Sequence, residues 1–332
     1  MKTRIAINGF GRIGRNLFRL LLNHPTIEVV AINDIADNKT MAHLVKYDSI
    51  HGVLNHKVSF SEDSIIIDDK SFLFFHEREI KNLHWKSLNI DIVIESTGKF
   101  KTFEDINQHI LVGAKKVILS APSEVDEIKT VVLGVNEHIL DGSETIISNA
   151  SCTTNNAAPM IKIIQELCEI EQAYITTVHS YTTDQSLHDQ PHKDLRRARG
   201  AAQSIVPTTT GAAKALTKIF PELEGKMGGC GIRVPVPDGS LTDITFNVKR
   251  QVSIEEINQA FKKAAETNFK GILDYTEDPI VSVDIIGNQN SCLFDAQLTS
   301  VIDKMVKIVG WYDNEIGYSS RLIDLITFVS KK

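Results

Sequence analysis

The stretch IAINGFGRIG, residues 5–14, contains the pattern that decides the fold. A short apolar run ends at Asn8, a glycine-rich turn follows, and apolar residues then recur at helical spacing. Strand, glycine turn and helix therefore occur in the order that a dinucleotide-binding βαβ unit requires. Gly9, Gly11 and Gly14 would allow a tight turn, close approach of the backbone to a pyrophosphate, and close packing of helix on strand. Glycine turns also serve packing alone, so the motif needs support from elsewhere in the chain.

That support comes from a second strand-like run at residues 29–32, which ends at Asn33 and Asp34. An acid at this place, about 20 residues beyond the last glycine, binds the hydroxyls of the adenosine ribose. Asp34 would repel a 2′-phosphate, which favours NAD over NADP. The alternative interpretation, a turn residue after a strand, is weaker once the glycine motif is present.

Further apolar runs predict strands at residues 90–94, 117–119, 131–135 and 146–147. Near-continuous apolar strands separated by helix-length segments, one of them around residues 41–48, indicate a parallel sheet covered on both faces. Ligands bind outside the carboxyl ends of such strands. Four of the predicted strands lead into polar or reactive residues, so we expect cofactor and thiol to share one crevice. These residues are Asp34, Thr97 with Gly98, Ser120 and Cys152.

Cys152 lies in the stretch SNASCTTN, residues 148–155, where a β-branched run ends and a helical pattern begins. The free N–H groups and positive dipole end of a helix N-terminus stabilise a thiolate, the form of cysteine that attacks an electrophile. A small buried structural cysteine is the alternative. The flanking hydroxyls and amides would be poor neighbours for a purely apolar core residue, so we expect a reactive thiol.

Beyond about residue 150 the pattern changes. Apolar or alternating runs predict strands without a helix between each pair, which indicates an antiparallel or mixed sheet in an α+β domain. The predicted strands cover residues 174–179, 232–236, 241–248, 280–286 and 305–311, and the predicted helices cover 209–219 and 253–267. We expect a Rossmann-type α/β domain that binds NAD, residues 1–150 with 315–332, and an α+β catalytic domain, residues 151–314.

Several residues of the second half suggest a base and anion sites. His179 ends a predicted strand; a lone histidine is more often structural, but beside a thiol it becomes a credible base. The basic run at 191–199 is a nucleic-acid patch, an anion site or a solvated face, and the lack of interleaved aromatic residues argues against nucleic acid. The hydroxyls and glycine at 208–213 open a helix and form a phosphate cradle. Arg233, an isolated cation in an apolar strand, needs an anionic partner.

Composition limits the possible functions. The chain has 332 residues, of which 42% are hydrophobic and 23% charged, with a net charge of -6. This is typical of a globular protein large enough for two cores, and its acidic balance offers no overall attraction for nucleic acid or an acidic membrane. The first residues form no signal-peptide core, and no run reaches the length of a membrane span. The four cysteines are widely spaced without zinc-ligand spacing, so we expect a cytoplasmic protein with no metal site.

These motifs, in this order, resemble one family closely, the phosphorylating glyceraldehyde-3-phosphate dehydrogenases. The likeness extends essentially from Ile5 to Leu325. It rests on INGFGRIGR (7–15), ND (33–34), KYDS..HG (46–52), SNASCTTN (148–155), HSYT.DQ (179–185), PHKDLRRAR (191–199), PTTTGAAKA (207–215), RVPVP (233–237) and WYDNE.GYS (311–319).

The resemblance implies a role for each matching residue. Cys152 would be the nucleophile and His179 its base. The residues implied for the cofactor are Arg12, Ile13, Asp34, Arg78, Ser120 and Asn314, beside the glycines of the turn. Thr182 and Arg233 would hold the phosphate of the substrate, and the remaining substrate and phosphate residues would be Ser151, Thr153, Arg197, Thr210 and Gly211. The implied reaction, part of glycolysis or gluconeogenesis, oxidises D-glyceraldehyde 3-phosphate to 1,3-bisphosphoglycerate with NAD and inorganic phosphate, through a thiohemiacetal and a thioester. A cytoplasmic homotetramer is also implied, in which the 180–206 loop reaches a neighbouring cofactor site.

Some positions depart from the family pattern. Asn156 replaces the second cysteine of the motif CTTNC, which removes a nearby thiol partner for Cys152 and bears on oxidation rather than turnover. Gln190 replaces a leucine next to Pro191, and a polar residue there leaves NADP open as a cofactor. Asp238 with Gly239 replaces Asn-Val, and Ile316 replaces an aromatic residue. Two alternatives remain: an erythrose-4-phosphate dehydrogenase, against which the intact 209–212 cradle argues, and a non-catalytic member that binds RNA or protein.

Overall fold

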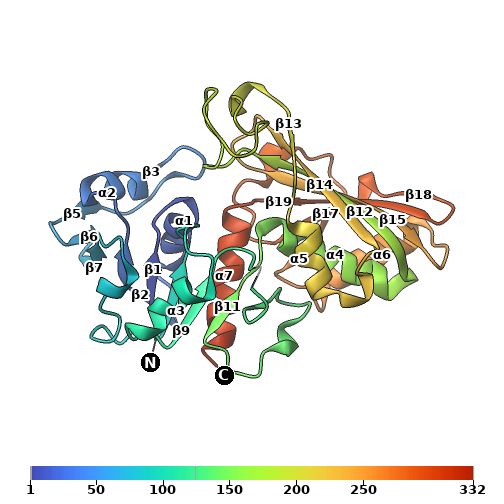
Figure 1. The fold of residues 1–332 in the computed structure, drawn as a ribbon. Coiled ribbons are helices and arrows are strands. Elements are labelled where there is room, and N and C mark those ends of the chain that lie inside the picture. Colours follow the sequence, from blue (N-terminus) through green and yellow to red (C-terminus); the bar gives the residue numbers. More distant parts are fainter. Residues whose placement is uncertain (1, 124, 332) are drawn as a thin grey trace. The chain divides into compact units, whose positions relative to one another are not determined.

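The computed structural model describes residues 2–123 and 125–331, which form two compact units. The first unit comprises the described residues up to Val131, Glu137–Ala150 and those from Ser319 onward. The second unit comprises Val132–Asn136 and Ser151–Tyr318. Figure 1 labels many of the helices and strands of both units.

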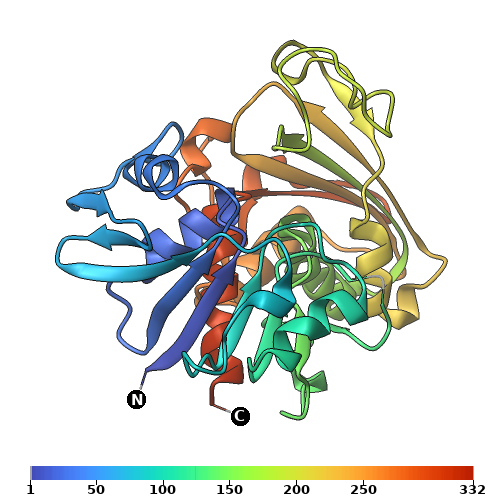
Figure 2. The ribbon, with the colours of Figure 1, turned by 60° about the vertical axis from the view of Figure 1, so that its left-hand side comes forward.

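The first unit contains a sheet with the strand order β10-β11-β9-β8-β1-β2-β7-β6-β5. Neighbouring strands from β10 to β7 are parallel, and β7, β6 and β5 are joined antiparallel. Its strands are β1 (Thr3–Asn8), β2 (Ile27–Asn33), β5 (Val58–Phe60), β6 (Ser64–Ile67), β7 (Lys70–Phe75), β8 (Ile92–Glu95), β9 (Lys116–Leu119), β10 (Lys129–Thr130) and β11 (Ile146–Ser148). The predicted parallel sheet is confirmed, and Figure 2 shows these strands side by side in blue to green.

Helices and a small hairpin complete the first unit. The helices are α1 (Arg12–Leu21), α2 (Asn38–Lys46), α3 (Phe103–Leu111) and the later part of α7 (Ile316–Val329), with 3-10 turns η1 (Ile80–Asn82) and η2 (Glu137–Ile139). Strands β3 (Tyr47–Asp48) and β4 (Gly52–Val53) pair antiparallel. Apolar residues of β1 are fully buried, and so are Leu17 and Phe18 of α1, where the Phe18 ring contacts the buried ring of Phe10 edge to face. The strand, turn and helix predicted at the start of the chain are therefore confirmed.

One strand predicted in this region is wrong. Residues 131–135 form a turn after β10 instead of a strand. Gly134 has a φ of +82° and the Asn136 side chain accepts a hydrogen bond from the Val132 amide at 2.8 Å, so the backbone turns back on itself. The run is apolar because Val131 and Val132 are buried in the core, which periodicity cannot separate from a buried strand.

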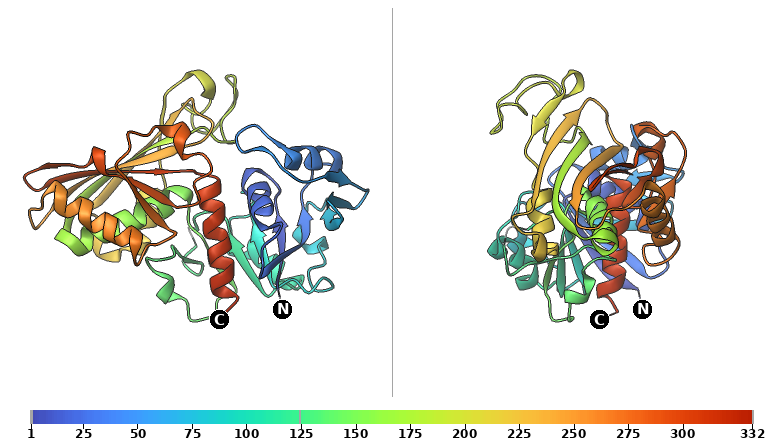
Figure 3. Two further views of the ribbon diagram at one scale, coloured as in Figure 1. Left: turned by 180° about the vertical axis from the view of Figure 1, so that it is seen from behind. Right: turned by 90° about the vertical axis from the view of Figure 1, so that its right-hand side faces the viewer.

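The second unit contains a mixed sheet of order β13-β14-β12-β15-β19-β17-β16, with β18 paired to β19. Its strands are β12 (Ile170–Ser180), β13 (Val206–Thr208), β14 (Met227–Val234), β15 (Ser240–Val248), β16 (Leu273–Thr276), β17 (Cys292–Asp295), β18 (Ser300–Ile302) and β19 (Met305–Tyr312). Its helices are α4 (Cys152–Cys168), α5 (Ala212–Ile219) and α6 (Ile254–Glu266), with 3-10 turns η3 (Ala201–Gln203), η4 (Pro221–Leu223), η5 (Ser282–Ile285) and η6 (Ala296–Leu298). The views in Figure 3 show α4 and α6 along the same face of this sheet.

The strand predicted at 280–286 is also wrong, because this segment forms the turn η5. Its apolar side chains mostly face water: Val281 and Val283 are exposed, and only Ile285 is fully buried. The Asp284 carboxylate accepts a hydrogen bond from the Val281 amide at 2.8 Å, which closes the turn. In the part of the chain that the structure describes, no helix is both long and apolar enough to span a membrane.

Candidate active site

Cys152 is the first residue of α4, directly after a tight turn from β11. Ala150 has a φ of +55°, a left-handed conformation that costs a residue with a side chain ~1 kcal/mol. Ser151 caps the helix, and its Oγ accepts a hydrogen bond from the Thr154 amide at 3.0 Å. The sulfur therefore starts from a helix N-terminus, as the sequence predicts.

His179 and Arg233 complete the surroundings of this thiol. They are register partners on the parallel strands β12 and β14, so they lie next to each other near the ends of those strands. Nε2 of His179 lies 3.5 Å from the Cys152 sulfur. Nη1 of Arg233 lies 2.6 Å from Nδ1 of His179 and donates to the Ser180 carbonyl at 2.9 Å. The fold thus brings the predicted nucleophile, base and anion-binding cation together.

Burial dominates the electrostatics of the pair. Burial raises the pKa of the Cys152 thiol, while the Arg233 charge and hydrogen bonds from Thr153 lower it. Burial, and then the Arg233 charge, lower the pKa of His179 to about 3. The net direction for the thiol is opposite to the one that a helix N-terminus alone predicts, because desolvation outweighs the dipole. Charge separation within the pair therefore requires transfer of the thiol proton to Nε2.

Tyr312 is a site residue that sequence reasoning did not single out. Its hydroxyl lies 3.0 Å from Oγ1 of Thr153 and 2.9 Å from Oγ1 of Thr177, and its ring meets that of His179 edge to face. Burial raises its pKa, so the phenol keeps its proton and can donate. It belongs to the motif WYDNE.GYS, which was a signal for its importance.

Arg233 remains available to an anion from outside the protein. Among the described residues, no carboxylate forms an ion pair with it, and its contacts are with His179 and a carbonyl. Burial lowers its pKa, but an arginine remains charged over the physiological range. Among the described residues, the expected anionic partner of this cation is therefore not a carboxylate in an ion pair; the negative charges of Cys152 and Asp184 nevertheless favour its charged form.

Two of the four cations of the basic run, Arg197 and Arg199, pair with carboxylates of the same loop. Arg197 forms an ion pair with Asp184 at 2.5 Å and donates to Oγ1 of Thr208 at 2.9 Å. Arg199 pairs with Asp189 at 2.8 Å. These two cations are therefore paired within the loop, whereas Lys193 and Arg196 are exposed, as a solvated face predicts.

The hydroxyl cradle lies just beyond this loop. The Thr210 hydroxyl accepts a hydrogen bond from the Ala212 amide at 3.2 Å, and Gly211 precedes the first residue of α5. A Cβ at Gly211 would meet no protein atom within 4 Å, so packing does not require glycine there. Thr182 follows the end of β12 and is partly exposed. Asn314 is buried, and its Oδ1 accepts hydrogen bonds from the hydroxyls of Ser180 and Ser240 at 2.8 and 2.7 Å.

A separate pocket in the first unit is lined by four of the nine predicted nucleotide residues, namely Gly9, Gly11, Asp34 and Arg78. It has a volume of about 280 Å³ and is lined by Asn8, Gly9, Gly11, Asn33, Asp34, Ile35, Glu77, Arg78, Ile80, Ser96, Thr97, Lys99 and Phe100. Oδ2 of Asp34 accepts a hydrogen bond from the Phe10 amide at 2.7 Å, which ties the acid to the glycine turn. Asn8, Asn33 and Glu77 were not predicted; the first two directly precede Gly9 and Asp34 in the sequence.

The three glycines of the turn have different surroundings. A Cβ at Gly14 would lie 2.2 Å from the Gly9 carbonyl oxygen, and one at Gly9, where φ is +96°, would lie 2.5 Å from the Thr97 nitrogen. A Cβ at Gly11 would meet no protein atom within 4 Å. Gly9 and Gly14 are therefore required by the turn and its packing, whereas the space at Gly11 is open for a ligand.

Other predicted cofactor residues do not line this pocket. The Arg12 side chain is held by Asp48 through contacts of 2.6 and 3.1 Å. Burial acts to raise the pKa of Asp48, but the Arg12 contacts and the amides of His51 and Ile50 together outweigh it and lower that pKa to about 2. Ile13 and Gly14 lie inside α1, and Ser120 directly follows β9. Any contact of Arg12 with a nucleotide would therefore come from its backbone in this conformation.

The positions that depart from the family pattern have structural roles. Asn156 is buried, and its amide contacts the carbonyls of Ser291, Gly310 and Trp311 at 3.2, 3.4 and 3.3 Å. Gly239 has a φ of +83°, and a Cβ there would lie 2.1 Å from the Ser282 carbonyl oxygen. The exposed Gln190 side chain contacts the Ser186 hydroxyl within its own loop. Nothing in the structure explains Ile316.

Comparison with known proteins relates both units to one family. A family model described as the NAD binding domain of glyceraldehyde 3-phosphate dehydrogenase matches residues 3–103, and one for the C-terminal domain of the same enzyme matches residues 151–314. The chain is similar to glyceraldehyde-3-phosphate dehydrogenase 2 of Streptomyces avermitilis, with 54% identity over the full length of both chains. It is 51% identical to glyceraldehyde-3-phosphate dehydrogenase of Geobacillus stearothermophilus, over 100% of this chain and 99% of the relative. With glyceraldehyde-3-phosphate dehydrogenase 1 of Bacillus cereus it shares 49% identity over 99% of each.

Proposed function

Because the chain belongs to the glyceraldehyde-3-phosphate dehydrogenase family, we propose that it oxidises glyceraldehyde 3-phosphate to 1,3-bisphosphoglycerate with NAD and inorganic phosphate. The observation that carries the proposal is the Cys152–His179 pair, with sulfur and Nε2 3.5 Å apart and Arg233 beside the ring. The domain division follows the same lines: residues 1–150 with 315–332 for NAD, and residues 151–314 for catalysis.

The pocket of the first unit fits a nicotinamide dinucleotide. Gly11 leaves open space at the N-terminus of α1, where backbone N–H groups favour a pyrophosphate. Asp34 would accept hydrogen bonds from the adenosine ribose, and Gly9 and Arg78 line the same pocket. Arg12, Ile13, Gly14, Ser120 and Asn314 complete the proposed set by resemblance. The cofactor, when bound, accepts the hydride of the oxidation.

Covalent catalysis begins at Cys152. Transfer of the thiol proton to Nε2 of His179 leaves a thiolate, which attacks the aldehyde carbon. The carbonyl oxygen takes that proton back from Nε2, which gives the thiohemiacetal hydroxyl and leaves the imidazole neutral. His179 then takes the proton of the hemiacetal hydroxyl as the hydride departs, which leaves a thioester on Cys152. The Arg233 charge stabilises the negative charge of the sulfur and opposes a positive charge on the imidazole. Before the reaction the site thus favours a neutral thiol and a neutral imidazole, and the thiol proton is transferred during the reaction.

Phosphate binding requires cations and hydroxyls on two sides of the thioester. We assign the substrate phosphate to Arg233 and Thr182, because Arg233 lacks a carboxylate partner among the described residues. The attacking phosphate would bind at the Thr210–Gly211 turn with Arg197, and Ser151 and Thr153 would line the site beside the nucleophile. Attack of inorganic phosphate on the thioester carbon releases the acyl phosphate and returns Cys152.

Steady-state kinetics tests the assignment. Reduction of NAD by glyceraldehyde 3-phosphate should depend on added inorganic phosphate, and replacing Cys152 by alanine should abolish it. Brisk turnover without phosphate, or a preference for erythrose 4-phosphate, would indicate the erythrose-4-phosphate dehydrogenase instead. Unchanged physiological activity of the Cys152→Ala protein would indicate a non-catalytic protein that binds RNA or protein. The same assay with NAD and with NADP measures the cofactor preference. A strong preference for NAD would support exclusion of NADP by Asp34, and comparable activity with NADP would support the tolerance that Gln190 suggests.

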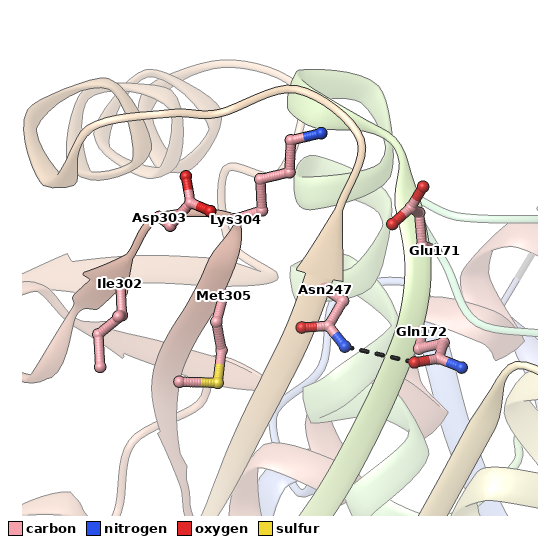
Figure 4. Close-up of a pocket in the computed structure, with 7 residues that line it drawn as sticks. All are labelled: Glu171, Gln172, Asn247, Ile302, Asp303, Lys304 and Met305. Atoms are coloured by element: carbon pink, nitrogen blue, oxygen red, sulfur yellow. Dashed lines mark hydrogen bonds between the residues drawn. The ribbon is translucent and has the colours of Figure 1, made fainter.

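We also propose that the chain forms a homotetramer in the cytoplasm. One face of the second sheet carries exposed apolar side chains, among them Tyr174, Ile302 and Met305. A hollow of about 610 Å³ at the edge of this face is shown in Figure 4, where Asn247 donates to Gln172 beside Met305. Such a surface supports contact with a second copy. All four cysteines are free thiols, which supports a reducing compartment. Sedimentation of the purified chain tests the assembly.

A further inference from the structure

We propose that Glu95 and His109, which do not themselves line the nucleotide pocket, are positioning residues for the nicotinamide cofactor. They fix the direction of a hydrogen-bond relay that ends on the pocket wall. The inference rests on the proposed binding of NAD and deepens it by naming residues behind the pocket.

The relay begins at the Glu95 carboxylate, at the end of β8 and 1% exposed. Oε1 accepts hydrogen bonds from the amide and hydroxyl of Thr97 at 2.9 and 2.5 Å. Oε2 accepts from Nδ2 of Asn8 at 2.6 Å and lies 3.1 Å from Nε2 of His109. A carboxylate only accepts, so each of these neighbours must present a hydrogen to it.

Trp85 fixes which ring nitrogen of His109 carries the hydrogen. The indole N–H lies 2.9 Å from Nδ1 of His109, and both side chains are fully buried. An indole nitrogen only donates, so Nδ1 must accept and the ring hydrogen must lie on Nε2. Nε2 therefore donates to Glu95, and the imidazole cannot turn over without losing both contacts.

Two asparagine amides carry this polarity to the pocket. Since Nδ2 of Asn8 donates to Glu95, its Oδ1 faces away and accepts from Nδ2 of Asn33 at 2.7 Å. Oδ1 of Asn33 then accepts from the Glu77 amide at 2.9 Å, and Nδ2 also donates to the Glu77 carbonyl at 2.9 Å. A flip of either amide would set donor against donor.

The ends of the relay are pocket residues. Asn8, Asn33, Glu77 and Thr97 all line the cavity beside Asp34. Glutamine at position 95 would present an NH₂ group either to Nδ2 of Asn8 and Nε2 of His109 or to the Thr97 amide, so donor would face donor on one side of its amide. Asn8 could relieve that conflict only by turning away from Asn33, whose own orientation is fixed by the Glu77 backbone. The pocket wall would then divide its population between two arrangements, and a cofactor that fits one of them binds more weakly.

Calorimetric binding of NAD and steady-state kinetics, on the wild type and on the Glu95→Gln variant, test the inference. We expect roughly tenfold weaker binding of NAD and a matching rise in its KM, because only about a tenth of the population would keep the pocket wall in the arrangement that binds NAD. The kcat at saturating NAD and the KM for glyceraldehyde 3-phosphate should stay at wild-type values. Glu62→Gln, the same change at an exposed position of the first unit, should match the wild type throughout. A merely structural role would lower kcat or thermal stability without moving the KM for NAD.

The outcomes separate this inference from the proposed function. A wild-type protein that binds no NAD would overturn both. A wild type that binds NAD, with a Glu95→Gln variant that binds it equally tightly, would overturn the relay alone. If Glu95→Gln does not fold, His109→Gln removes the ring donor and keeps the carboxylate; we expect weaker NAD binding with unchanged kcat. Unaltered NAD binding by that variant would also overturn the relay.

Discussion

Nη1 of Arg233 lies 2.6 Å from Nδ1 of His179, which places a permanent cation against the proposed catalytic base. The two residues are register partners on neighbouring strands, so the contact is fixed by the sheet. Together with burial, this contact disfavours the imidazolium, and the pKa of His179 falls to about 3.

The stability of the folded chain should therefore fall in acid because of His179. Its folded pKa is lower than its unfolded value of 6.5, so the contribution is present above pH 6.5 and is lost as pH falls toward about 3. In urea unfolding across this range, the free energy of unfolding should fall by a few kcal/mol less for His179→Asn than for the wild type. The exposed His138, changed to asparagine, should follow the wild type. Parallel curves for His179→Asn and wild type would contradict the assignment.

Asp238 should have the opposite pH dependence. It is 1% exposed, and burial followed by the charges of Asp313 and Glu315 raises its pKa to about 9. Its contribution is present below the unfolded value of 3.8 and is lost as pH rises toward about 9. Asp238→Asn should raise the free energy of unfolding at pH 8 by a few kcal/mol and leave it nearly unchanged at pH 4.

The exposed Asp278 offers a matched control for Asp238. Asp278→Asn should leave the pH dependence of unfolding as in the wild type. If the free energy of unfolding of Asp238→Asn relative to the wild type did not rise between pH 4 and pH 8, the charged form of this buried carboxyl would not destabilise the fold.

Two glycines of the same turn should respond differently to alanine. Gly14→Ala places a Cβ 2.2 Å from a backbone oxygen and should cost about 1–3 kcal/mol of stability in thermal or urea unfolding. Gly11→Ala meets no protein atom within 4 Å, so stability should be retained while NAD binding weakens roughly tenfold. Equal affinity for NAD in Gly11→Ala and wild type would argue against a pyrophosphate at this place.

Asn156 should be a stabilising residue in this chain. Its buried amide contacts three backbone carbonyls, those of Gly310 and Trp311 in β19 and that of Ser291 directly before β17. Asn156→Cys, the residue typical of the family, should lower the free energy of unfolding by about 1–3 kcal/mol because those acceptors lose their donor. Asn247→Ala is the control, since Asn247 is exposed with one long hydrogen bond to Gln172. Equal midpoints for Asn156→Cys and wild type would contradict the prediction.

Local features of the site were predictable, and those set by distant contacts were not. The turn at Gly9–Gly14 and the helix beginning at Cys152 are encoded by neighbouring residues, so periodicity and glycine spacing identify them. The contact of Tyr312 with Thr153 joins residues 159 positions apart, and no local pattern encodes it. The raised pKa of Cys152 has the same origin, because desolvation depends on how the whole unit packs around the sulfur. The apolar segment at 131–135 shows the converse case. A short run of buried apolar residues has the same sequence pattern whether it forms a strand or a turn.

The ion pairs within the basic run have a consequence for what the loop attracts. Arg197 and Arg199 face Asp184 and Asp189 at contact distance, and His192 lies 3.4 Å from the same Asp184. Neighbouring opposite charges such as these largely cancel at distances beyond the Debye length, whereas the exposed Lys193 and Arg196 of the same run keep their charge toward the solution. A small anion that enters the loop meets the Arg197 guanidinium itself and can compete with the Asp184 carboxylate. Binding of a phosphate here is therefore an exchange of one anion for another, and its strength depends on how well the phosphate replaces the carboxylate.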